Sequence, residues 1–178
     1  MKARLSNVLL MLSLVGFAVN IGGTFYQMTV IIPEWSNELP LSVSRFFGDG
    51  KWAAAQSRFW THPLTDGGIL FFIAGLIVSW RYTKRRNWML LTLLILVPVF
   101  LSTMLWFVPH GFFPLMRDAG AGMMASEITT RAESWIFLDK VRFVGILLAF
   151  VAALQALATA PLRRERSAES PITGETNV

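Results

Sequence analysis

WMLLTLLILVPVFLSTMLWFV, residues 88–108, decides the fold class of this chain, because its 21 positions hold no charged residue. A helix needs about 17 to 25 apolar residues to cross a hydrocarbon layer of roughly 30 Å. Three further apolar blocks lie at 5–32, 64–80 and 141–160. The 54% hydrophobic content and mean hydropathy of +0.52 are too high for a soluble domain. The sequence therefore predicts an integral membrane protein with four spans.

The spans are predicted to be helices. Isolated strands would leave backbone N–H and C=O groups unpaired in lipid, and the blocks lack the strict alternation of a membrane barrel. We therefore expect an all-α, integral membrane four-helix bundle formed by residues 1–162. Residues 163–178 are polar and rich in helix breakers, and we expect them to be a disordered cytoplasmic tail.

The positive charges indicate the topology. The chain has a net charge of +5, and many of its cations lie beside the predicted spans rather than in one patch, which argues against a nucleic-acid partner. Because cytoplasmic loops are enriched in Lys and Arg, we expect a multi-pass protein of the cell membrane with both termini cytoplasmic. The first span continues too far for a cleaved signal peptide and is expected to be retained. The cations that carry this assignment are Lys2, Arg4, Arg81, Lys84, Arg85, Arg86, Arg163, Arg164 and Arg166.

Two kinds of site are excluded or disfavoured by residue usage. The chain has no cysteine, which excludes thiol–disulfide chemistry, iron–sulfur clusters and thiolate zinc sites. Its two histidines, His62 and His110, belong to no metal-binding or nucleotide-binding motif. We therefore expect no metal and no cofactor.

Two longer connections join the spans on the non-cytoplasmic side. In the connection at 33–63, the segments 41–47 and 51–60 have amphipathic patterns, and Gly48-Asp-Gly50 separates them as a turn. We expect two short surface helices that form a lid. The second connection is predicted to begin at Pro109 and to give way to a long helix from about Ser126 to Ala160.

Polar residues inside apolar spans are costly and therefore face partners, cavities or water. In the first span, Gly16, Asn20, Gly23 and Gln27 share one helical face. This stripe is either a packing seam between helices or the lining of a ligand cavity.

The third and fourth spans each carry a similar polar set. Thr103, Trp106 and His110 are spaced i, i+3, i+7, and Trp135, Asp139 and Arg142 are spaced i, i+4, i+7. The first set consists either of interface anchors or of a site in which His110 accepts a proton. In the second set, Asp139 and Arg142 form either an intrahelical ion pair at the membrane boundary or part of a polar site.

Four segments, GGTFYQMTVIIPEW (22–35), RRNW (85–88), TMLWFVP (103–109) and RAESWIFLDKVR (131–142), together resemble the small four-helix anthrone oxygenase-like membrane family. The similarity covers roughly residues 5–160, and most members of the family are of unknown function. Its named members are cofactor-free oxygenases that convert an anthrone to an anthraquinone. The resemblance implies a four-helix membrane fold, but no active-site motif of the family can be matched residue by residue.

Such an oxidation needs a base, aromatic walls and groups that stabilise an oxyanion. By chemistry, the candidate bases are His110 and Asp139. The candidate substrate-binding residues are Asn20, Gln27, Trp106, Trp135 and Arg142. We expect a membrane protein that contacts the lipid bilayer and binds a lipophilic small molecule in the outer half of the bundle, with its biochemical role left open. The alternative is a cofactor-free oxygenase of anthrone-like aromatic substrates.

Overall fold

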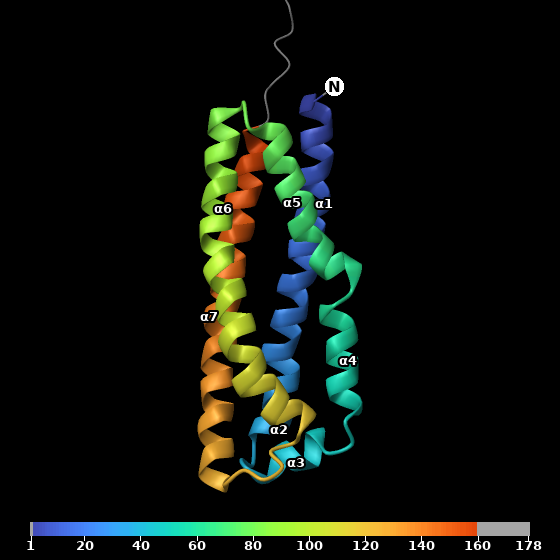
Figure 1. Cartoon of the computed structure of the whole chain (residues 1–178), viewed down its shortest axis with the longest axis vertical. Coiled ribbons are helices and arrows are strands. Elements are labelled where there is room, and N and C mark those ends of the chain that lie inside the picture. The colour runs from blue at the N-terminus through green and yellow to red at the C-terminus, as the bar shows by residue number, and fades with distance from the viewer. Residues whose placement is uncertain (1, 160–178) are drawn as a thin grey trace, which may run out of the picture.

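A computed structural model gives the fold of residues 2–159. The predicted cytoplasmic tail and the domain boundary at residue 162 lie outside these described residues. The described part of the chain consists of helices and turns and has no strand, which confirms the all-α prediction (Figure 1). In chain order the elements are α1 (Lys2–Tyr26), the π-helical segment η1 (Gln27–Ile31), α2 (Ile32–Ser36), α3 (Leu41–Phe47), α4 (Lys51–Trp60), α5 (Pro63–Ser79), α6 (Thr83–Ser102), the π-helical segment η2 (Thr103–Arg117) and α7 (Ala125–Ala158).

Three stretches of continuous helix are long and apolar enough to cross a membrane. They are Ala3–Ser36, Thr83–Arg117 and Ala125–Ala158. The remaining expected span, at 64–80, corresponds to α5, which has 17 residues and whose apolar part, Gly67–Ser79, is shorter than the other three. At 1.5 Å per residue, α5 is about 25 Å long.

The long helical stretch Thr83–Arg117 does not end where its prolines predict. We expected a connection from Pro109, but α6 and η2 continue to Arg117. In a π-helix each N–H bonds to the carbonyl five residues earlier. Pro109 and Pro114 lie inside this segment, as Pro98 lies inside α6. The N–H of Asp118 donates to the carbonyl of Phe113, five residues earlier, at 2.9 Å and closes the last such turn. The prediction that Pro109 ends the helix is therefore wrong.

The predicted surface helices are confirmed. The segments α3 and α4 have the expected bounds, and Gly50 between them adopts φ 68°, a left-handed conformation that glycine reaches at little cost. The long final helix begins at Ala125, one residue before the expected start. Each of these elements has a strong local pattern between clear breakers.

The helices are arranged as two pairs. α1 packs mainly on α5, and α6 packs mainly on α7, while α1 also contacts α7. α5 and α6 are consecutive in the chain but contact each other much less, and below the turn that joins them they lie apart in Figure 1. The end that holds this turn, with Arg4, Arg81 and Lys84, is called the basic end. The opposite end, with α2, α3 and residues 118–124, is called the loop end.

Two hydrophobic cores fill the bundle. The first, between α1, α5, α6 and α7, includes Leu10, Phe17, Phe72 and Met89. The second lies toward the loop end and is centred on the aromatic residues Trp35, Phe47, Phe107 and Trp135. The space between these two cores is the part of the bundle that concerns function.

One cation of the basic end is not where the sequence placed it. The sequence places Arg85 among the cations that lie beside the predicted spans, but α6 already begins at Thr83 and Arg85 is fully buried. Its Nη1 donates to Ser6 Oγ at 2.6 Å, its Nη2 to Asn7 Oδ1 at 2.6 Å and its Nε to the Ala156 carbonyl at 3.1 Å. Ser6 also hydrogen-bonds Ser79. Arg85 therefore connects all four long helices of the basic end.

Candidate functional site

A cavity of about 580 Å³ lies between the two cores. Residues of both cores line it: Phe17 of the first, and Phe107 and Trp135 of the second. Most of its remaining wall is aliphatic or aromatic. This volume is within the range of about 300 to 1,000 Å³ that is typical of small-molecule sites. Its polar lining residues are Asn20, Gln27, Gln56, Ser57, Thr61, Thr103 and Arg142.

The two amides of the first helix lie in this wall. Asn20 and Gln27 are seven residues apart, which places them on one face of the helix. Gln27 is only 4% exposed, and among the described residues neither amide side chain makes a hydrogen bond. The N and O atoms of these two amides are not among the fully buried unpaired side-chain atoms of the described residues, so they keep some exposure where they line the cavity. A molecule bound in the cavity could hydrogen-bond with them.

The glycines of the same stripe have the other expected role. A Cβ added to Gly68 of α5 would lie 3.2 Å from the Cα of Gly16, so α1 and α5 approach closely there. Gly23 lies against Phe59 of α4. The stripe that the sequence left open between a seam and a cavity is thus both: its glycines form the seam and its amides line the cavity.

Asp139 and Arg142, which the sequence left open between an ion pair and a polar site, form the ion pair. Arg142 donates from Nη1 to Asp139 Oδ1 at 3.0 Å, and Asp139 is completely buried. Asp139 Oδ2 and Arg142 Nε have no hydrogen-bond partner among the described residues. The guanidinium of Arg142 also lies 4.5 Å from the ring centroid of Phe107, within the range of a cation–π contact. Arg142 lines the cavity, whereas Asp139 lies behind it.

Trp135 forms the aromatic wall of the cavity. Its ring meets Phe107 edge to face at 4.4 Å and Trp35 at 6.0 Å. Gly111 of η2 makes room for this ring, because a Cβ at that position would lie 2.9 Å from Trp135 Cε3. The absence of a side chain at one residue of η2 therefore fixes the position of this aromatic wall.

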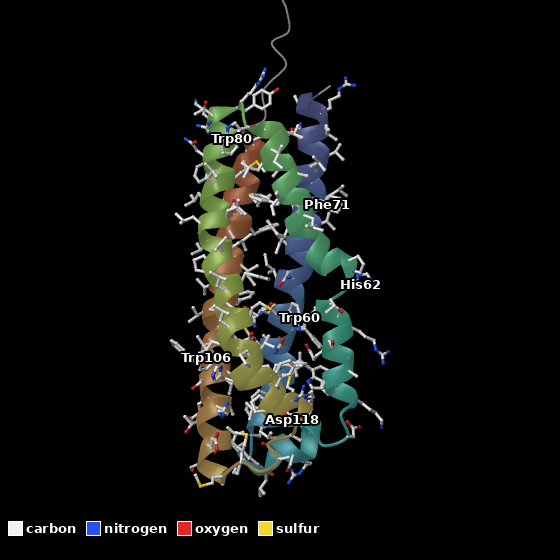
Figure 2. All side chains as sticks on the ribbon, viewed as in Figure 1. Trp60, His62, Phe71, Trp80, Trp106 and Asp118 are labelled. Carbon is white, nitrogen blue, oxygen red and sulfur yellow. The ribbon has the colours of Figure 1, made fainter. Side chains whose placement is uncertain are left out.

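Trp106 and His110 lie outside this cavity. Both are exposed, their rings stack at 5.6 Å, and His110 Nδ1 lies 3.1 Å from the Trp106 carbonyl. Trp106 lines a second hollow of about 870 Å³ between α6–η2 and α7, which shares Val99, Phe107 and Arg142 with the cavity. Figure 2 shows Trp106 at the outside of the bundle. A π-helix rotates less per residue than an α-helix, so Thr103 faces the cavity while the residues that were expected to share its face do not.

The structure thus brings together four of the predicted site residues, Asn20, Gln27, Trp135 and Arg142, with Asp139 joined to the last of them. It also adds α4, which the sequence predicted only as a lid. Trp60 of α4 lines the cavity and donates from its indole N–H to Gln56 Oε1 at 2.6 Å (Figure 2). Gln56 and Trp60 are four residues apart on one face of an amphipathic helix, and this spacing is the signal that could have identified them.

No metal site is visible in the described part of the chain, where no group of three or more His, Cys, Asp or Glu side chains lies close enough to hold an ion. Comparison with protein-family models, curated proteins and solved structures gave no match. The site must therefore be interpreted from its own geometry.

Proposed function

We propose that the chain is a four-span membrane protein, with both termini cytoplasmic, that binds a lipophilic small molecule in the cavity between its two cores. In this topology α5, the expected span at 64–80, also crosses the membrane, because it packs along α1. Positive charge gathers at the basic end, where α1 begins and α5 turns into α6 (Figure 1). The cavity then belongs to the outer half of the bundle.

The observation that carries the binding role is the combination of an apolar cavity with an amide in its wall that makes no hydrogen bond with the described residues. Apolar walls with a few polar groups are typical of sites for lipophilic molecules. Gln27 supplies one such group, and Arg142, held by Asp139, supplies a second. This role needs no catalytic residue.

Native mass spectrometry of the protein released gently from detergent tests the proposal, because it reports the subunit number and any retained small molecule together. We expect a stoichiometric adduct that is not bulk lipid. Thr103→Phe, in the cavity wall, should remove the adduct. Leu105→Phe is the matched control, since Leu105 is 71% exposed and does not line the cavity. Two outcomes would contradict the binding role. One is an adduct that persists in both Thr103→Phe and Leu105→Phe, and the other is the absence of any adduct from both the wild type and Leu105→Phe.

An oxygenase of anthrone-like substrates is the second candidate, supported by the aromatic wall of Trp135 and Phe107 beside the cationic Arg142. In that reaction one O₂ supplies the new carbonyl oxygen, and its second oxygen leaves as water with the two methylene hydrogens. Neither candidate base, His110 or Asp139, lines the cavity. O₂ uptake with anthrone as substrate distinguishes the two roles. Turnover that disappears in His110→Ala or Asp139→Asn would favour the enzyme, and turnover retained in both would exclude these residues as the base.

A further inference from the structure

The cavity also indicates which class of molecule it takes, and this inference rests on the proposed binding function. We propose that the ligand is a neutral, membrane-dissolved amphiphile whose head is a carbonyl group, as in a ketone, quinone or ester. The head lies beside Gln27 and Arg142. The apolar tail leaves the cavity between α5 and α6 into the hydrocarbon layer, and the ligand enters by the same route.

Arg142 is the lining side chain that can only donate. Its Nη2 group makes no hydrogen bond with the described residues. The amides of Asn20 and Gln27 each present both an NH₂ donor and a carbonyl acceptor, so they can pair with either kind of ligand group. On α4, Gln56 uses its oxygen to accept the Trp60 indole N–H, which leaves its NH₂ group. A ligand oxygen that accepts hydrogen bonds therefore satisfies Arg142 and Gln56, whereas a ligand donor would leave Arg142 without a partner.

The charge of the site favours a neutral head. Arg142 is already balanced by Asp139 at 3.0 Å, and no other charged side chain lines the cavity. A carboxylate or an ammonium on the ligand would add an uncompensated charge to an apolar space, which is costly. A carbonyl satisfies the donors without adding charge.

The wall between α5 and α6 is open. Ile73 of α5 and Val97 and Phe100 of α6 line the cavity, yet they are 42%, 50% and 50% exposed. α5 and α6 pack on other helices rather than on each other, and they lie apart in Figure 1. Since these residues belong to apolar helices at the depth of the bilayer, the opening meets lipid chains. A tail longer than the cavity can therefore remain in the membrane.

Four probes with one C16 chain and different heads test the head-group preference: 2-hexadecanone, hexadecane, hexadecanoate and hexadecylamine. Binding is measured by native mass spectrometry and by the shift in melting temperature in dodecylmaltoside, a detergent without carbonyl groups. We expect 2-hexadecanone to bind most tightly. Gln27→Met should weaken it about threefold to tenfold, the effect of one lost hydrogen bond, and should leave hexadecane unchanged. Gln155→Met, at an exposed position of α7 outside the cavity, should have no effect.

The entry route has its own matched pair of variants. Val97→Trp places a bulky ring in the opening, whereas Leu94→Trp places the same ring on an exposed position of α6 that does not line the cavity. In liposomes preloaded with 2-hexadecanone, Val97→Trp should lose uptake and Leu94→Trp should retain it. Equal uptake by the two variants would overturn the lateral route. So would a dimer in the mass spectrum that Val97→Trp abolishes, because a second chain would then cover the opening.

The two proposals fail in different ways. Equal binding of the ketone and the alkane, or tighter binding of hexadecanoate or hexadecylamine, would overturn the carbonyl head while leaving a lipophilic site intact. Binding of none of the four probes, together with no adduct in the wild type, would overturn the binding function itself.

Discussion

Gly23 of α1 lies directly beneath the ring of Phe59 on α4: a Cβ at Gly23 would sit 2.5 Å from two carbons of that ring. This contact holds the surface helix against the bundle next to the cavity that Trp60, the following residue, helps to line. A single missing side chain in a membrane helix thus determines how closely the lid approaches.

Gly23→Ala should loosen α4 without unfolding the bundle. The Phe59 ring is 38% exposed and can turn away, so we expect the free energy of unfolding to change by less than about 1 kcal/mol. Limited trypsin cleavage at Lys51 and Arg58 should become faster. Gly22→Ala is the control, because it gains the same helix propensity but meets no atom within 4 Å. Equal cleavage rates in the two variants would show that Gly23 does not position α4.

Arg85→Met should destabilise the basic end. The substitution removes three hydrogen bonds from a charged donor. Asn7 Oδ1 loses its partner, while Ser6 keeps Ser79 and the Ala156 carbonyl keeps Thr159. We expect a loss of roughly 1 to 3 kcal/mol. Thermal unfolding in detergent should show a clear loss relative to Lys84→Met, which changes an exposed cation one residue away. Arg85→Lys should recover only part of the loss, because an ammonium lacks the planar fork of donors. If Arg85→Met and Lys84→Met had the same melting temperature, the hydrogen bonds of Arg85 would not contribute to stability.

The Asp139–Arg142 pair should show strong coupling. Removal of one partner from a buried pair typically costs about 3 to 5 kcal/mol, because the other charge is left uncompensated. We therefore expect Arg142→Met and Asp139→Leu each to be strongly destabilising, and the double variant to be more stable than either. A double-mutant cycle of chemical unfolding measures this coupling. Additive losses would mean that the two side chains do not interact as the 3.0 Å distance indicates.

Gly111→Ala should displace the aromatic wall. The added methyl would lie 2.9 Å from Trp135 Cε3, and this ring is 1% exposed between Phe107 and Trp35, so it can shift only toward the cavity that it lines. Overpacking of this kind costs about 1 to 3 kcal/mol. Unfolding in detergent should show that loss, and binding of 2-hexadecanone should weaken. Gly22→Ala again serves as the control. A stable Gly111→Ala variant with unchanged binding would contradict the role of Gly111 as the space for Trp135.

Several elements were predictable because their signals are local. The surface helices at 41–47 and 51–60 have their own amphipathic pattern and a glycine turn between them, and the structure has both with the same bounds. The ion pair of Asp139 and Arg142 follows from their spacing on one helix. Gln27 and Asn20 were candidates because an amide in an apolar span is costly unless it faces a partner, a cavity or water.

Other features depended on backbone geometry that the sequence does not state. The residues from Thr103 onward form a π-helix, and this altered rotation separates Trp106 and His110 from the cavity that Thr103 lines. The same segment continues through Pro109. A pattern read with α-helical spacing cannot anticipate either result.

The sequence by itself determined the helical class, the apolar helices and the polar residues that are costly in a membrane, because composition and periodicity act within a few turns of chain. Only the tertiary structure decided which of those residues share one space. Arg85 is buried because it hydrogen-bonds with Ser6, more than seventy positions away in the sequence. Arg142 forms part of the cavity wall because Phe107, on another helix, packs against it. Such contacts depend on how helices pair, and that pairing is a property of the whole packed bundle.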